Sequence, residues 1–425
     1  MQPSPPASTA RACLGALLVL ALAGPLSLSA CSRCAAVQDR FELETRDVLA
    51  RTGPGGRVDT GLNDHLQLLL APEDVERVAD GVLRAEWLRG ASDRAVVQTG
   101  AGEALLEVEL VPRISGFRPY PPQDEHSASL EVELVVYARL TGPEVRERVT
   151  FNVEGQVDVA LALENRPAPA LVLDASRASL EVEPPDLDAL PGEARGAAET
   201  LTRSLFEEVL RQAPRTLDVV RFGPLNLGAR RMPLTASSLR VYPSGALRIG
   251  FVSELRVAGE AMPPLEGPIS TAWRVHEDAL RAAMEYLAAI GAAPRRFDES
   301  GRASVTGPFA STDVRLTWSP STVRADFDWW CLAGRRCRVE SASLVLEQEW
   351  SEAAPRIALV RTDDASSAPG RFRGVAASAS GVVEGFAAGA ALELASGAAL
   401  ALRPRSGSVA QGAWLVFGPL AEPEE

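Results

Sequence analysis

Alternation of apolar and polar residues is the strongest pattern in this chain. Over residues 149–163 every odd position except Gly155 is apolar, whereas most even positions are polar. This period of two predicts a strand with one buried face. Fifteen residues at about 3.3 Å each extend over roughly 50 Å, which is much longer than an ordinary strand of about five or six residues. The pattern therefore predicts a large, curved antiparallel sheet, with Gly155 as a bulge or bend.

Shorter stretches of the same alternation occur at residues 106–110, 130–134 and 180–183, where Leu and Val alternate with Glu. Each stretch predicts a strand whose glutamates face water rather than an acidic ligand site. Because directly opposed glutamates repel, we expect arginines on the neighbouring strands. Two hairpins are predicted at residues 239–251, around Pro-Ser-Gly, and at residues 314–327, around Ser-Pro-Ser-Thr.

Three segments change to the period of an amphipathic helix, at residues 72–89, 193–212 and 276–290. Each carries one apolar stripe, which predicts packing against a sheet. The region 375–410 is rich in Ala, Gly and Ser and predicts no second long helix. A Pro- and Gly-rich linker is predicted at residues 261–268.

On both sides of this linker a short strand leads into a helix with early acidic residues, and long strands follow. We therefore expect an α+β, β-rich fold in which long, highly curved antiparallel sheets wrap amphipathic helices. The fold would form two tandem modules, residues 61–260 and 269–420, related by a divergent duplication.

The first residues of the chain have the pattern of an export signal. Arg11 is the one charged residue within residues 1–30, and an apolar run of about 11 residues follows it, too short for a membrane span of roughly 20. The sequence Leu-Ser-Ala-Cys31 then resembles a bacterial lipobox. We interpret residues 1–30 as a lipoprotein signal peptide and Cys31 as the lipidation site; the alternative is an ordinary secretory signal with a chance Cys.

An acyl-anchored protein needs a connection between anchor and body. Residues 31–60, which include Thr-Gly-Pro-Gly-Gly at 52–56, are predicted to be a flexible tether. Ser32, in place of an Asp, favours the outer membrane over the inner membrane, on its periplasmic or surface side. The expected location is the bacterial cell envelope.

Three cysteines would remain beside the lipidated one, namely Cys34, Cys331 and Cys337. The last two flank a short loop with a central Gly, and an oxidising envelope favours a local disulfide between Cys331 and Cys337. A metal site is less favoured because no His or second Cys pair is close in the sequence. Trp329 and Trp330 precede this loop, and we interpret them as an exposed contact for membrane headgroups or a protein partner.

Composition narrows the range of functions. The formal net charge is −13, all 43 basic residues are arginine, and no basic block stands out, so nucleic-acid binding is not expected. Three His residues, no Lys and no recognisable catalytic motif predict no catalytic residues, no metal site and no cofactor. Asp326 and Asp328 could act in acid–base chemistry or bind calcium, although alternating acids on a strand more often face water.

The order of elements resembles the tubular lipid-binding superfamily, which includes bactericidal/permeability-increasing and lipid-transfer proteins. In that family a strongly twisted sheet wraps a long helix, and the apolar groove between them holds acyl chains. The segment 193–212 matches the wrapped helix in its placement. The resemblance implies a lipid-binding lining made by the inward face of the long strand and one stripe of this helix, at Phe151, Val153, Val157, Val159, Leu201, Leu205 and Val209.

Taken together, these features predict a non-enzymatic, lipid-anchored envelope protein that binds lipid or another long apolar ligand. Lipid transfer is a further expectation, which follows from the resemblance alone. The expected partners are the membrane, through the acyl anchor, and the apolar ligand; a protein partner is compatible with the sequence. The alternative is a structural or interaction lipoprotein with a closed, dry core. An enzyme of unrecognised type is the third interpretation.

Overall fold

The structure is a computed structural model of the whole chain. It describes residues 34–417 except for residues 54–63, 83–90, 101, 120–126, 143–145, 175–179, 183–186, 188–189, 191, 213–215, 229, 258–267, 320–321, 335–336, 352–353, 362–368, 389–390, 395–398, 402–408 and 412–413. The predicted signal peptide, Cys31 and nearly all of the predicted linker lie outside the described residues.

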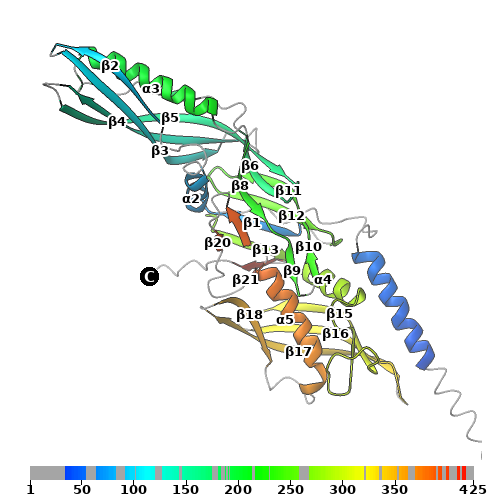
Figure 1. Ribbon diagram of the computed structural model, residues 1–425. Coiled ribbons are helices and arrows are strands. Elements are labelled where there is room, and N and C mark those ends of the chain that lie inside the picture. The colour runs from blue at the N-terminus through cyan, green and yellow to red at the C-terminus, as the bar shows by residue number, and fades with distance from the viewer. Residues whose placement is uncertain are drawn as a thin grey trace, which may run out of the picture.

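The molecule is elongated, with its three larger sheets following one another along its length (Figure 1). We call residues 64–257 the first half and residues 268–417 the second half. A long sheet, built mainly from the first half, lies at one end, and a five-stranded sheet of the second half lies at the other. This arrangement confirms the expected α+β, β-rich class.

The long sheet has nine strands and is antiparallel throughout its pairings. Its central strands are as long as the alternation predicts, and its order is β2-β3-β4-β5-β6-β8-β19-β20, with β7 beside β5. The bounds are β2 Ala91–Thr99, β3 Gly102–Pro119, β4 Ser127–Thr141, β5 Arg146–Glu164, β6 Ala170–Asp174, β7 Leu180–Val182, β8 Thr216–Phe222, β19 Ala391–Leu394 and β20 Ala399–Ala401.

Register within this sheet explains its charge pattern. Glu107 of β3 is paired with Arg139 of β4, as expected for glutamates on a shared face. The pairing of β4 with β5 runs through Gly155 without a shift, so the predicted bulge is not there. The sheet instead has its irregularity in β3, between Ile114 and Gly116, where a glycine allows the strand to bend.

A six-stranded central sheet joins the two halves, in the order β11-β12-β1-β13-β22-β21. Its strand β1 is completely buried and lies between β12 of the first half and β13 of the second. The hairpin predicted at residues 239–251 is confirmed as β11 and β12. The bounds are β1 Leu66–Leu70, β11 Leu234–Val241, β12 Leu247–Ser253, β13 Ala272–His276, β21 Val409–Gln411 and β22 Trp414–Phe417; a small ribbon is formed by β9 Leu225–Leu227 and β10 Arg230–Met232.

The five-stranded sheet of the second half has the simple order β14-β15-β16-β17-β18. The hairpin predicted at residues 314–327 is confirmed as part of β15 and β16. The bounds are β14 Arg296–Phe297, β15 Phe309–Trp318, β16 Thr322–Cys331, β17 Arg338–Ser351 and β18 Ala354–Arg361.

All three predicted helices are confirmed, as α2 (Pro72–Val82), α3 (Gly192–Gln212) and α4 (Glu277–Ala289). A fourth, α5 (Arg373–Ala388), follows a short turn η2 (Pro369–Phe372) and corrects the expectation that this region lacks a long helix. Its many small residues make the contrast between its apolar and polar faces weak in the sequence. One face is nevertheless buried, at Val375, Ala379, Val382, Val383 and Phe386.

A helix over residues 34–52, here called the N-terminal helix, corrects the prediction of a flexible tether in this part of the chain. Its residues Phe41 and Val48 are buried. Phe41 packs on Trp330 of β16, with 5.5 Å between ring centroids. The segment is ordered because it supplies apolar side chains to the second half, which a solvated linker would not do.

Candidate functional site

A continuous apolar face runs along the long sheet of the first half. Leu106, Val108 and Leu110 of β3 are buried, whereas the intervening Glu107 and Glu109 are exposed. The three buried residues are paired with Leu140, Ala138 and Val136 of β4, which are also buried. Matching alternation on adjacent strands therefore gives the sheet one apolar side.

Strand β5 carries the four strand residues predicted to line a lipid site. Phe151 is paired with Val136, one of the buried residues of β4. Val153, two residues later, is paired with Leu134. Val157 and Val159 are paired with Leu130 and Ala128. These register positions continue the apolar side of the sheet along β5, while the side chains themselves lie outside the described residues.

Helix α3 covers part of this apolar side. It packs mainly against β2 and β3, and Figure 1 shows it running along β2. Leu205 is buried and Leu201 is partly buried against the core, as the helix stripe predicts. The Val209 side chain lies outside the described residues. The stripe also contains Phe206, Ala194 and Ala198, which were not predicted as site residues although they follow the same helical spacing.

Helix and sheet differ in length. The 21 residues of α3 extend about 32 Å at 1.5 Å per residue. The 19 residues of β5 extend about 63 Å at 3.3 Å per residue. A helix of this length spans about half of the strand direction. Helix α2 also packs on β3 and β8, and Leu161 near the end of β5 lies in the closed junction with the central sheet.

The junction between the long sheet and the central sheet is closed. A cavity of about 10 Å³ lies there, which is the size of a single water site and far too small for an acyl chain. It is lined by aliphatic side chains from α2 and the surrounding strands, at Leu70, Val75, Val78, Leu161, Leu171, Leu173, Val219 and Leu247.

Aromatic side chains fill the second half. Trp329 packs against Phe297, Phe309 and Phe372, with ring centroids 5.6, 5.5 and 5.1 Å away. Helix α5 lies over the strands of this half (Figure 1) and packs on β18, and it also contacts β9 of the first half. The helix–sheet layer of the second half is therefore closed by large rings.

Trp329 and Trp330 are not the exposed membrane or partner contact predicted from the sequence. Their exposed fractions are 1% and 0%. Successive residues on a strand point to opposite faces, and both faces of β16 are covered here. Trp329 lies among the aromatic rings described above, while Trp330 packs on Phe41 and its Nε1 donates a 2.8 Å hydrogen bond to Thr312 Oγ1.

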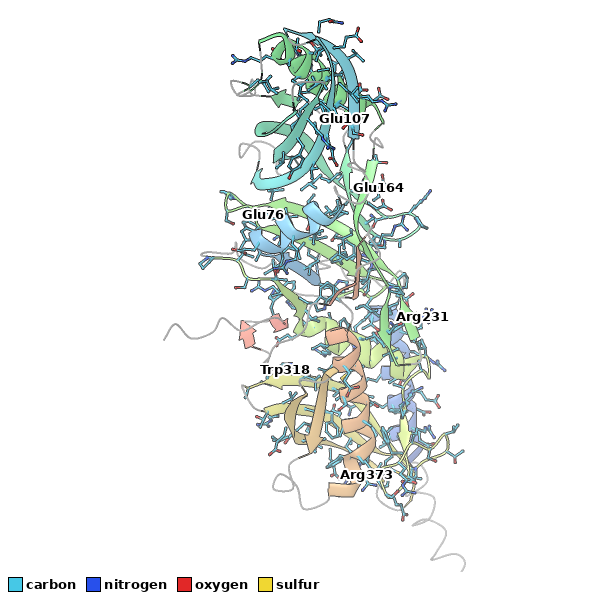
Figure 2. The ribbon with its side chains drawn as sticks, turned by 60° about the vertical axis from the view of Figure 1, so that its left-hand side comes forward. Glu76, Glu107, Glu164, Arg231, Trp318 and Arg373 are labelled. Atoms are coloured by element: carbon cyan, nitrogen blue, oxygen red, sulfur yellow. A yellow bond between two sulfur atoms is a disulfide. The ribbon has the colours of Figure 1, made fainter. Side chains whose placement is uncertain are left out.

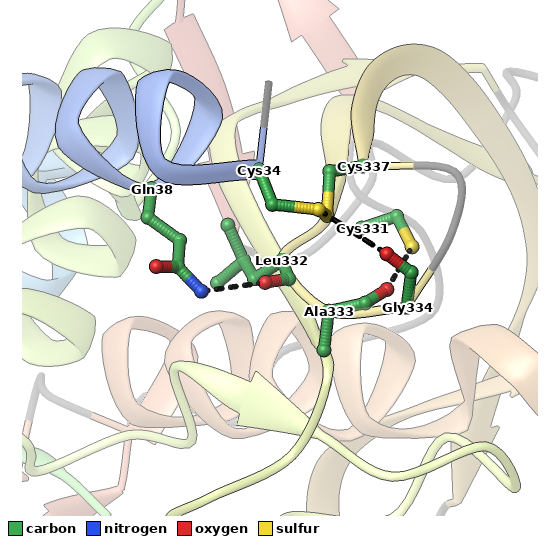
Figure 3. Close-up of a disulfide and its surroundings, with 7 residues drawn as sticks. All are labelled: Cys34, Gln38, Cys331, Leu332, Ala333, Gly334 and Cys337. Atoms are coloured by element: carbon green, nitrogen blue, oxygen red, sulfur yellow. Dashed lines mark hydrogen bonds between the residues drawn. A yellow bond between two sulfur atoms is a disulfide. The ribbon is translucent and has the colours of Figure 1, made fainter. Parts of the chain in front are cut away.

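The cysteine pairing also differs from the prediction. Cys337 forms a disulfide with Cys34, at the start of the N-terminal helix, and Cys331 is free (Figure 3). Cys331 lies opposite Arg338 in the β16–β17 ladder. Successive residues alternate between the two faces of the hairpin, so Cys337, which precedes Arg338, is on the face opposite to Cys331. Trp330 lies on that same face, where the N-terminal helix packs. The sequence separation of 303 residues gave no local signal for this bond.

Polar contacts along the N-terminal helix add to the disulfide. Gln38 Nε2 donates a 2.7 Å hydrogen bond to the carbonyl oxygen of Leu332. Glu44 accepts a 2.9 Å hydrogen bond from Thr312. Near the other end of the helix, Arg51 lies 3.7 Å from Glu285 of α4, whose pKa is raised above its usual value because the carboxyl group is buried. The helix is thus held at both ends.

Asp326 and Asp328 line a concavity of about 470 Å³ on the sheet of the second half. Arg324 lies 2.9 Å from Asp326, and Ser341 donates a 3.1 Å hydrogen bond to Asp328. Local partners therefore satisfy these carboxylates. Among the described residues, no group of three or more His, Cys, Asp or Glu side chains could hold a metal ion.

His276 stands at the beginning of α4, as its place before two acidic residues suggests. Its Nδ1 accepts a 3.2 Å hydrogen bond from the backbone N–H of Asp278. Its ring packs edge-on against Trp414, and burial lowers its pKa. The residue has the contacts of a structural helix cap.

None of the helices in the described part of the chain is long and apolar enough to cross a membrane. No protein-family model and no curated protein matches the sequence. Among solved structures, a lipopolysaccharide binding protein is similar with a TM-score of 0.35 and 9% identity, over 84% of this chain and 98% of that one. P47 from Clostridium botulinum A2 is similar with a TM-score of 0.29 and 9% identity, over 76% of this chain and 87% of that one. Both likenesses are weak, and they assign no ligand to this chain.

Proposed function

We propose that this chain is a lipid-anchored, non-catalytic protein of the cell envelope whose first half binds lipid or another long apolar ligand. The ligand would lie on the apolar side of β3, β4 and β5, beside α3. The observation that carries the proposal is the mismatch between a sheet face about 63 Å long and a covering helix of about 32 Å.

An acyl chain suits such a face for energetic reasons. Each methylene transferred from water to an apolar surface contributes about 0.8 kcal/mol. Ten methylenes therefore contribute about 8 kcal/mol before the cost of ordering the ligand is subtracted. The predicted lining is aliphatic at Val153, Val157, Val159 and Leu201, which suits a flexible chain better than a planar ring.

The anchor is proposed at Cys31, after removal of residues 1–30, in the outer membrane. The disulfide between Cys34 and Cys337 supports an oxidising compartment. A lipid-binding body tethered to the envelope would hold its ligand close to its place of use. We extend the proposal to lipid transfer, because the order of strands and helices resembles that of a superfamily that includes lipid-transfer proteins.

The direct test is to purify the chain without residues 1–31 and analyse it by native mass spectrometry and lipid extraction. We expect copurified lipid, or saturable binding of added lipid. Leu201→Arg, on the partly buried stripe of α3, should reduce the bound lipid severalfold, whereas Val96→Arg, at a position 66% exposed on β2, should leave it unchanged. Circular dichroism would confirm that both variants fold. If the protein neither copurifies with lipid nor binds added lipid, the proposal is refuted.

A structural or interaction lipoprotein with a closed core is the second candidate function. It is favoured by the aromatic filling of the second half and by the closed 10 Å³ junction. If this function is correct, the purified body carries no lipid and crosslinking in the envelope captures a protein partner.

A further inference from the structure

The position of the disulfide restricts how the body can lie on a membrane. Cys34 is three residues after Cys31, the proposed lipidation site, and it is bonded to Cys337 at the beginning of β17. The following steps rest on that proposed anchor. The bond fastens the end of the β16–β17 hairpin to the segment that bears the lipid.

The N-terminal helix cannot extend away from the body as a free linker. Besides the disulfide, it is held by the buried ring of Phe41, by the Gln38–Leu332 hydrogen bond and by Arg51 at its other end. The backbone N–H of Arg256 also donates a 3.2 Å hydrogen bond to the carbonyl oxygen of Thr52. The reach of the anchor is therefore set by residues 31–34 alone.

The reach can be bounded from covalent geometry. Three residues span at most about 11 Å when fully extended. The Cα atoms of Cys34 and Cys337 are 5.1 Å apart. Cys337 therefore lies within about 16 Å of the lipidated residue, roughly half the thickness of a bilayer's hydrocarbon core.

The first half lies at the other end of the elongated molecule. Figure 2 shows Glu107 near one end and Arg373 near the other. The first residues of the N-terminal helix are on the side of the second half (Figure 1). Strands that extend about 60 Å place much of the apolar sheet face far beyond the reach of the anchor.

We infer that the disulfide end of the second half rests on the bilayer that holds the acyl anchor, and that the lipid-binding face projects away from it. The docking surface comprises the described residues at the end of the β16–β17 hairpin, 331–334 and 337–338, and the neighbouring residues 298–308. The two segments adjoin through the hydrogen bond from Leu332 N–H to the carbonyl oxygen of Pro308. Its partner is the lipid surface itself. The first half would then exchange its ligand with a second membrane or a carrier, rather than with the anchoring bilayer.

Resonance energy transfer on vesicles tests this orientation with the full lipidated protein. The background variant is Cys331→Ser, which removes the free thiol and leaves the disulfide intact. A donor dye is attached through Val305→Cys in one sample and through Val96→Cys in the other; these positions are 94% and 66% exposed and lie in opposite halves. The vesicles are phosphatidylcholine–phosphatidylglycerol mixtures with an acceptor on the headgroups.

We expect transfer from position 305 to be severalfold more efficient than transfer from position 96. Equal efficiencies, or a higher efficiency from position 96, would overturn the inference. Failure of the protein to acquire an acyl group would overturn this inference together with the anchor part of the proposed function. The lipid-binding part is tested separately, because copurified lipid is measured on the body without its anchor.

Replacing both Cys34 and Cys337 by Ser adds a second readout and leaves no free thiol except the dye site. Without the bond, only non-covalent contacts hold the N-terminal helix, so the spread of donor–acceptor distances at position 305 should widen. Time-resolved donor decays would show this change. An unchanged distribution in the double variant would show that the disulfide does not set the orientation, and would overturn that part of the inference.

Discussion

The two halves of this molecule use the same plan, a helix against an antiparallel sheet, with different packing. Helix α5 of the second half approaches β9 of the first half so closely that a Cβ added at Gly385 would lie 2.5 Å from the carbonyl oxygen of Asn226. Gly196 of α3 lies on the exposed side of its helix, and a Cβ added there would have no neighbour within 4 Å. The comparison teaches that one plan can be filled in two ways: aromatic rings around Trp329 close the second half, whereas the described buried face of β3 and β4 in the first half is aliphatic.

The largest effect should come from the aromatic cluster. Trp329→Ala removes a fully buried ring that packs on Phe297, Phe309 and Phe372. We expect a loss of about 3–5 kcal/mol in the free energy of unfolding, measured by denaturant titration. Val96→Ala, at an exposed position of the first half, should change it by less than about 0.5 kcal/mol. A loss below about 1 kcal/mol for Trp329→Ala would contradict the closed core.

Loss of the disulfide should have the next largest effect. Cys34→Ser opens a loop of 303 residues and should lower the free energy of unfolding of the oxidised protein by about 2–4 kcal/mol. Cys331→Ser is the matched control, because that thiol is free, and should have little effect. Peptide mapping by mass spectrometry would identify the bond directly. If Cys331→Ser were the more damaging change, the pairing predicted from the sequence would be correct instead.

Replacing single helix glycines by alanine tests how closely each helix packs on its sheet. Gly385→Ala should destabilise the protein by about 1–3 kcal/mol, because the added methyl group meets backbone. Gly196→Ala should stabilise it by about 0.5–1 kcal/mol, because alanine favours the helix and the space is open. Gly381→Ala, in α5 but also without a neighbour within 4 Å, controls for the helix itself. Thermal unfolding of the three variants measures the differences, and the same sign at positions 385 and 381 would refute tight packing of α5.

The smallest effect concerns pH. Burial raises the pKa of Glu285, so the native state binds its proton more strongly than the unfolded state does. The stability that this group contributes is present below its ordinary pKa and is lost as the pH rises through the raised value. The free energy of unfolding of the wild type, relative to Glu285→Gln, should therefore fall as the pH rises above the ordinary value of 4.5. Since His276 is present in both proteins, its opposite contribution cancels, and a flat difference would contradict the prediction.

Local periodicity explains what could be predicted from the sequence. The alternation along β5 and the stripes of α2, α3 and α4 lie within single elements, so the sequence alone indicates which face is apolar. Helix α5 was not predicted because alanine, glycine and serine reduce the contrast between its faces. The burial of Leu201 and Leu205 follows from the stripe of α3, and Phe206 could have been added from the same spacing.

Contacts between distant segments explain what could not be predicted. The burial of Trp330 depends on Phe41, almost 300 residues earlier in the chain. The choice of Cys34 over Cys331 depends on the same packing of the N-terminal helix. A hairpin loop with two cysteines is the nearest pairing in the sequence, but strand register turns Cys337 toward the helix. Neither outcome leaves a signal in the local sequence.

The place of β1 in the central sheet has a consequence for biosynthesis. This buried apolar strand emerges early, yet its partners β12 and β13 are synthesised much later. Until then both of its edges lack their native hydrogen bonds, which is a recognised route to aggregation. We therefore expect that truncation before β13 yields an insoluble product, because β1 then lacks one of its two neighbours.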